Sequence, residues 1–187
     1  NISNVVALRG DPPEGTQDLS STLNEFRYAE DLVKHINAAG RFSIAVAGYP
    51  EKHIEAPSMA ADIDNLKRKV DAGADAIITQ LFYNNDDYFE FVNLCINSGI
   101  HVPIIPGLMP ILDVQQIQRI TSMCGATIPR GLLRDLLKTE GDRSATHRLG
   151  IEHTINQATE LKKNGAPGIH FYVLNQYFHI SEIMTAI

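Results

Sequence analysis

Short runs of β-branched and other apolar residues alternate with amphipathic segments, and this alternation most constrains what the chain can fold into. Five runs predict buried strands of a parallel sheet: residues 5–8, 42–47, 76–81, 102–107 and 168–174. Strand–helix alternation is typical of an α/β fold. The 187 residues have the length of one domain, so we predict a single α/β domain over residues 1–187.

The segments between these runs carry apolar residues at helical spacing, most clearly over residues 59–70. We expect Asp86 or Asp87 to cap the third helix and Asp113 to cap the fourth, because a carboxylate can accept a bond from a free backbone N–H. Residues 129–164 are long enough for two further helices.

Two architectures fit this pattern. A doubly wound sheet would be complete with five strands, whereas a TIM barrel needs eight strands and typically about 250 residues. Length alone favours the doubly wound sheet. However, the chain starts at Asn1 and reaches its first apolar run by Val5, so we expect that an upstream part of the protein is absent.

Composition excludes several classes of function. The formal net charge is −6, which argues against general nucleic-acid binding. No apolar run approaches the roughly eighteen residues of a membrane span. Cys95 and Cys124 lack metal-ligand spacing, so we expect reduced thiols in a cytoplasmic protein. Glycine-rich phosphate loops, zinc motifs and nucleophile elbows are missing from the sequence.

Polar residues gather at the carboxyl ends of the predicted strands, where ligands bind in both architectures. They are Arg9, Gly10 and Asp11, then Tyr49 and His53, then Gln80, and finally Asn175 and Gln176. Gln80 is the most informative because apolar residues surround it, and a buried amide must find hydrogen-bond partners. A ligand is one candidate partner.

The helix predicted over residues 59–70 has a polar flank. At 100° per residue, Asp62, Asn65 and Lys69 fall within about 60° of one another, and Arg68 extends this arc. One interpretation is a solvated face with intrahelical ion pairs. The other is a flank that meets a phosphate-bearing cofactor through its two cations. The pattern leaves both open.

Six motifs follow one another along the chain: LRGDPP at 8–13, AGYPEKHIEA at 47–56, DIDNLKRKVDAGAD at 62–75, ITQLF at 78–82, PIIPGLMP at 103–110 and HFYVLN at 170–175. In this order and spacing they resemble the methylenetetrahydrofolate reductase family, and the resemblance covers nearly the whole chain.

The resemblance implies a TIM barrel that binds FAD, takes a hydride from NADH or NADPH and reduces methylenetetrahydrofolate to methyltetrahydrofolate. This chain would supply strands four to eight, with three βα units, roughly 90 residues, absent at the N-terminus. The resemblance further implies a cytoplasmic homo-oligomer in one-carbon metabolism and methionine supply, without nucleic-acid, membrane or metal partners.

The resemblance also assigns roles to residues. It places Asp11 between flavin and pterin as the catalytic residue of this chain. Gln80, Gln116 and Gln176 join Asp11 as substrate-binding residues. The cofactor-binding residues implied are Arg9, Gly10, Asp11, Tyr28, Ala29, Tyr49, His53, Ala56, Asp62, Asn65, Arg68 and Lys69.

The chain departs from the family pattern at two positions. Gln176 stands where some relatives carry an arginine that can pair with the folate tail, and Ile120 stands where some carry an aromatic residue. The family's general acid, a glutamate near the start of the barrel, has no counterpart here. This absence leaves open a non-catalytic flavin-binding relic or subunit. A pterin-binding transferase without flavin is a further alternative, although the polar flank over residues 59–70 argues against it, because a pterin alone needs no such long polar track.

Overall fold

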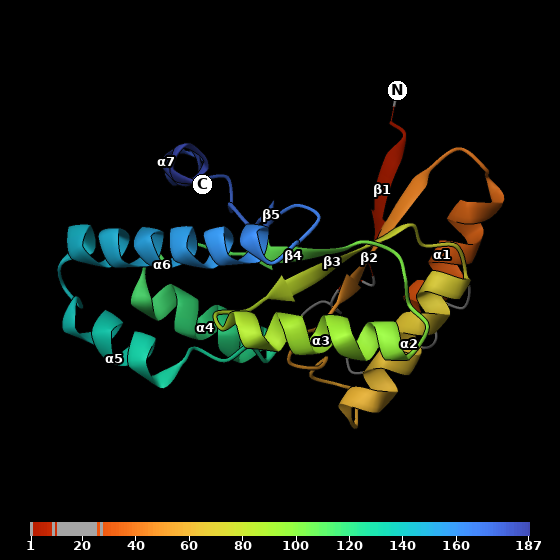
Figure 1. Cartoon of the computed structure of the whole chain (residues 1–187), viewed down its shortest axis with the longest axis horizontal. Helices are drawn as coiled ribbons and strands as arrows, with labels where there is room; N and C mark the ends of the chain where they lie inside the picture. Colours follow the sequence, from red (N-terminus) through yellow and green to blue (C-terminus); the bar gives the residue numbers. More distant parts are fainter. Residues whose placement is uncertain (1, 9, 11–25, 27) are drawn as a thin grey trace.

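The computed structural model describes residues 2–8, 10, 26 and 28–187. Within them, a single parallel sheet of five strands follows the chain order β1-β2-β3-β4-β5 (Figure 1). The strands are β1 (Asn4–Ala7), β2 (Ser43–Gly48), β3 (Ala76–Leu81), β4 (Ile104–Leu108) and β5 (His170–Phe171).

The strand order decides between the two architectures. A doubly wound sheet reverses its strand order at a switch point, whereas here each strand pairs in parallel with the one that precedes it in the chain. The doubly wound alternative is therefore wrong. The α/β prediction is confirmed, and the sheet is consistent with part of a TIM barrel.

Helices follow each strand: α1 (Ala29–Ala38), α2 (Met59–Asp71), α3 (Asn85–Asn97), then α4 (Val114–Cys124), α5 (Arg130–Lys138) and α6 (Arg143–Lys163) between β4 and β5, and finally α7 (Phe178–Ala186) after β5. Contacts run from α1 to α2, from α2 to α3, from α3 to α6 and from α6 to α7. Helices α4 and α5 lie between α3 and α6 in the chain but outside this series of contacts.

The helix caps agree only in part with the expected ones. Asp113 caps α4 as predicted, since its carboxylate accepts a bond of 2.7 Å from Gln116 N. The prediction of Asp86 or Asp87 for α3 is wrong: Asn84 is the cap, and its side chain accepts from Asp86 N at 3.2 Å. The two aspartates lie in the first turn, where their negative charges interact favourably with the positive end of the helix dipole.

The main core lies on one face of the sheet. Ile44, Val46 and Ile77 are almost inaccessible there, whereas the alternating residues Ala45 and Ile78 are only half-buried. The apolar runs predicted strands buried on both faces, so the second face is more open than expected. Tyr49, directly after β2, and Gln80, in β3, alternate with the buried residues and therefore belong to this more open face.

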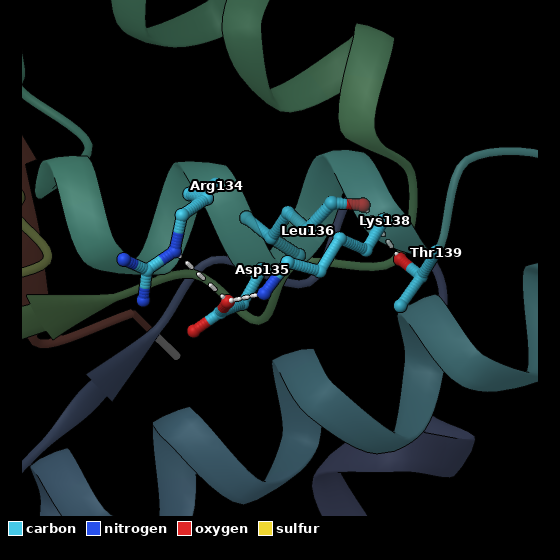
Figure 2. A network of polar contacts seen from close by, with 5 residues as sticks. All are labelled: Arg134, Asp135, Leu136, Lys138 and Thr139. Carbon is cyan, nitrogen blue, oxygen red and sulfur yellow. Dashed lines mark hydrogen bonds and ion pairs between the residues drawn. The ribbon is translucent and has the colours of Figure 1, made fainter.

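A second core joins α4 and α5 to the carboxyl ends of β3 and β4. Its buried members include Leu81, Met109, Ile117 and Leu136. The outer side of α5 is polar: Figure 2 shows Asp135 accepting bonds from Arg134 Nε at 3.3 Å and from Lys138 Nζ at 2.7 Å. Because these ion pairs are exposed, they contribute little to stability.

Candidate functional site

The loop after β2 is held in shape by Lys52. This residue adopts a left-handed conformation with φ of 78°, which is uncommon for a non-glycine residue. Its Nζ donates to His53 O at 2.9 Å and to Ala56 O at 2.6 Å. Sequence reasoning assigned no role to Lys52, although it lies inside the quoted motif at 47–56. Ala56, a predicted cofactor residue in the same loop, is buried.

Asp62 anchors the same loop to α2. Its side chain is buried, and its Oδ2 accepts from His53 N at 2.8 Å. The His53 ring meets the Tyr49 ring edge-on, with centroids 4.6 Å apart. His53 Nδ1 accepts from Glu55 N at 3.1 Å. The structure thus brings the predicted residues Tyr49, His53 and Asp62 together.

Lys69 joins this cluster from the far end of α2. Its Nζ donates to Ala47 O at 2.6 Å and lies 5.9 Å from the centre of the Tyr49 ring. Burial lowers the pKa of Lys69 to about 8, and the nearby charge of Asp62 opposes part of this shift. A half-buried ammonium beside the end of β2 is suited to pair with an anionic ligand.

The rest of the α2 flank is exposed. Asn65 and Arg68 both lie at the surface, and Arg68 pairs with Asp64 at 3.6 Å. That pair matches the solvated-face interpretation, whereas Asp62 and Lys69 turn inward to the loop and the strand. The flank therefore has a solvated part, Asn65 and Arg68, and a part that faces the loop and the strand, Asp62 and Lys69. Helical spacing alone could not distinguish the two.

Gln80 lies next to this cluster across the sheet. Gly48 pairs with Thr79 in the β2–β3 register, so Tyr49 and Gln80 follow at the same level of neighbouring strands. Gln80 is half-buried rather than fully buried, and its Oε1 accepts from Leu81 N at 3.0 Å. The expected buried amide is thus a partly open amide fixed by the backbone.

Gln116 and Gln176 line one small pocket. The side chains of Met109, Tyr172 and His179 border it as well, between the end of β4 and the segment after β5. Both glutamines are exposed. Leu174 and Asn175, with φ of 43° and 63°, turn the chain sharply before Gln176. Two residues predicted to contact substrate therefore share a site, although they are 60 positions apart in the chain.

The remaining predicted residues lie at the start of the chain. Arg9 and Asp11 are outside the described residues. Gly10 is exposed, and a Cβ there would meet no neighbour within 4 Å. Tyr28 caps α1, with its N–H donating to Asp31 Oδ2 at 3.0 Å, and half-buried Ala29 begins the helix.

The described residues contain neither a cluster of metal ligands nor a helix that could span a membrane. Nowhere in residues 2–8, 10, 26 and 28–187 do three His, Cys, Asp or Glu side chains gather as a metal site requires. Among the same residues, no helix combines the length and apolar character needed to cross a membrane.

Fold and site together define an α/β protein built on part of a barrel, with its candidate ligand residues at the carboxyl ends of the strands. A solved structure supports this class: a Clostridium thermocellum protein, described as binding two copies of 5-methyl-5,6,7,8-tetrahydrofolic acid. The match covers 84% of this chain and 56% of the Clostridium chain, with a TM-score of 0.57 and 20% sequence identity. These values show a shared fold.

The sequence comparisons identify the family. The family model for methylenetetrahydrofolate reductase matches residues 1–187, and the chain belongs to this family. A probable NADPH-dependent member from Caenorhabditis elegans is 41% identical over 189 residues, covering 100% of this chain and 28% of the relative. An NADH-dependent member from Arabidopsis thaliana is 40% identical, covering 93% and 31%.

A bacterial relative matches over a larger share of its own length. The 5,10-methylenetetrahydrofolate reductase of Escherichia coli is 37% identical over 175 residues, covering 94% of this chain and 57% of the relative. The chain thus spans less than two thirds of each of these relatives. Both nicotinamide donors occur among the named proteins.

Proposed function

We propose that the protein carrying this chain is an FAD-dependent methylenetetrahydrofolate reductase that takes its hydride from NADH or NADPH. Family membership supports the reaction. The observation that carries the proposal is the cluster of Tyr49, His53, Asp62 and Lys69, because it presents a half-buried cation beside an aromatic ring at the end of a strand.

The donor set of this cluster fits a flavin dinucleotide. Lys69 has three N–H donors, of which Ala47 O takes one. Asn65 and Arg68 add exposed donors along the same flank, and the Tyr49 ring offers an apolar face. In our proposal these residues and His53 hold the cofactor. FAD, when bound, would receive a hydride from the nicotinamide and donate it to the folate.

In this proposal the substrate lies on the side of Gln80 that is away from the cluster of Tyr49, His53 and Lys69. The Gln80 oxygen is occupied by Leu81 N–H, so its amide presents N–H donors to a ligand. The pocket between Gln116 and Gln176 is only about 20 Å³, so in this proposal the exposed amides of the two glutamines meet the rest of the folate at the surface. They do so without the charge-assisted pair that an arginine at position 176 would form. Asp11 would supply the carboxylate between the flavin and the pterin.

The test is an assay of the full-length protein. Purified protein should carry flavin absorbance and should oxidise NADH or NADPH when methylenetetrahydrofolate is supplied. Running both donors in parallel measures the donor preference. Bound flavin without turnover would favour the non-catalytic alternative, and binding of the folate by a flavin-free protein would favour the transferase.

A further inference from the structure

The sheet is irregular where β3 passes Gln80. Ile78 pairs with Ile105, but Leu81 pairs with Gly107, so Thr79 and Gln80 together lie opposite the single residue Pro106. This arrangement is a β-bulge, a feature that often lies next to a functional site and redirects a side chain. Pro106 has no N–H to donate to β3.

Three side chains bond the backbone groups around this bulge. Gly107 N donates to Thr79 Oγ1 at 2.9 Å, and the Tyr172 hydroxyl donates to Thr79 O at 2.9 Å. Leu81 N donates to Gln80 Oε1 at 3.0 Å. Because buried backbone groups must find partners, each of these bonds holds the bulge in its observed shape.

We propose that Thr79 and Tyr172 are positioning residues that hold the Gln80 amide in the orientation that binds the folate ring, an inference that rests on the proposed function. Gln80 reaches Leu81 N only while the bulge keeps its shape. Its Oε1 is then occupied, and Nε2 is the group presented to a ligand. A flipped amide would place its NH₂ group against the Leu81 N–H.

The surroundings of the pair fit this role. Thr79 is inaccessible to solvent, so its hydroxyl serves the protein rather than a ligand. The Tyr172 hydroxyl is protonated at physiological pH, and burial raises its pKa further, to about 12, so it can donate to Thr79 O. Gly107 allows the close approach: a Cβ there would lie 2.2 Å from Thr79 O.

The experiment measures binding of 5-methyltetrahydrofolate to the full-length protein by calorimetry, with flavin content and melting temperature recorded for each variant. Thr79→Val keeps the shape of the side chain but removes the hydroxyl, whereas Thr79→Ser keeps the hydroxyl and serves as the matched control. Tyr172→Phe removes one oxygen and serves as a second, independent probe if Thr79→Val fails to fold.

We expect Thr79→Val and Tyr172→Phe each to weaken binding by roughly threefold to tenfold, the loss of one neutral hydrogen bond. Thr79→Ser should bind as the wild type does. In a Gln80→Ala background the same two substitutions should weaken 5-methyltetrahydrofolate binding by less than about twofold, because the amide that Thr79 and Tyr172 position is gone.

The outcomes separate the inference from the proposed function. Losses of equal size in both backgrounds overturn the inference alone, since the pair would then act independently of Gln80. Unchanged binding by Gln80→Ala removes Gln80 from the site and the inference with it. If the wild type itself does not bind 5-methyltetrahydrofolate, the proposed function fails.

Discussion

The buried surroundings of Lys69 disfavour its protonated, charged form. Its folded pKa of about 8 is below the ordinary value of 10.5, so the unfolded chain binds more protons between these two values. This group therefore makes the folded protein more stable as pH rises through that window. An anionic ligand has the opposite preference, because it pairs with the protonated form.

The affinity for FAD should therefore fall as pH rises above about 8, by at most about tenfold per pH unit. Lys69→Arg is the matched control, because a guanidinium stays charged throughout this range. Fluorescence titration of full-length protein with FAD at pH 7, 8 and 9 measures the slope. The same slope in the arginine variant would remove Lys69 from the explanation.

Asp11 provides a second prediction at the scale of one residue, derived from the resemblance. A carboxylate between flavin and pterin should help to stabilise the cationic form of the folate. Asp11→Asn should thus slow folate reduction at least about tenfold, or about 1.4 kcal/mol in the barrier. Flavin reduction by the nicotinamide should slow much less.

Stopped-flow measurement of the two half-reactions separates these effects, with flavin content as the control for folding. Equal slowing of both half-reactions would indicate a general effect on the flavin site. No slowing of either would exclude Asp11 from the mechanism.

At this scale the sequence indicated which residues share a helix flank, but it did not indicate contacts between residues that are distant in the chain. Asp62 and Lys69 could be predicted because their spacing places them on one helix flank. The Tyr172 hydroxyl bonds a carbonyl 93 positions away, and no local pattern contains that information. The left-handed backbone of Lys52 was missed for a different reason: its partners, His53 O and Ala56 O, are local, but a lysine at this position does not indicate a positive φ.

At the scale of elements, the packing of α6 depends on a glycine. A Cβ on Gly150 would lie 1.8 Å from Ile111 O, which is backbone and cannot move aside cheaply. Gly131, in α5, is exposed and would have no neighbour within 4 Å. These two helical glycines therefore form a matched pair.

Gly150→Ala should destabilise the full-length protein by about 1–3 kcal/mol, because the new methyl group overpacks the helix against the loop. Gly131→Ala should stabilise it by up to about 1 kcal/mol through helix propensity. Urea unfolding of both variants checks the prediction. A Gly150→Ala variant as stable as the wild type would mean that α6 can shift away from Ile111.

The strands were predictable to within a few residues, except the fifth. Apolar runs predicted β3 at its observed bounds and β2 within one residue at each end. Residues 168–174 predicted a long last strand, but β5 is only His170–Phe171. The positive φ angles of Leu174 and Asn175 turn the chain, and an apolar composition does not reveal such a turn.

At the scale of the whole molecule, the sheet has an open edge and an open face. In the described part of the chain β1 pairs with β2 alone, and Val6 and Leu8 are each about half exposed, at 51% and 54%. Local patterns could not choose between a doubly wound sheet and a barrel, because strand order depends on how distant elements pack. The resemblance made that choice.

A polypeptide limited to residues 1–187 should self-associate through β1, since unpaired strand edges template further pairing. Light scattering should show association that increases with concentration, and Val6→Lys should reduce it. A soluble monomer of this polypeptide with a sharp, cooperative thermal transition would contradict the prediction.

The position of α4 and α5 has a consequence for ligand selection. Helix α3 contacts α6 directly, so these two helices adjoin without α4 or α5 between them. The pair of α4 and α5 packs instead on the carboxyl ends of β3 and β4 and carries Gln116. If Gln116 binds substrate as proposed, substitutions on the exposed side of α4 would change ligand selection without touching the contact between α3 and α6.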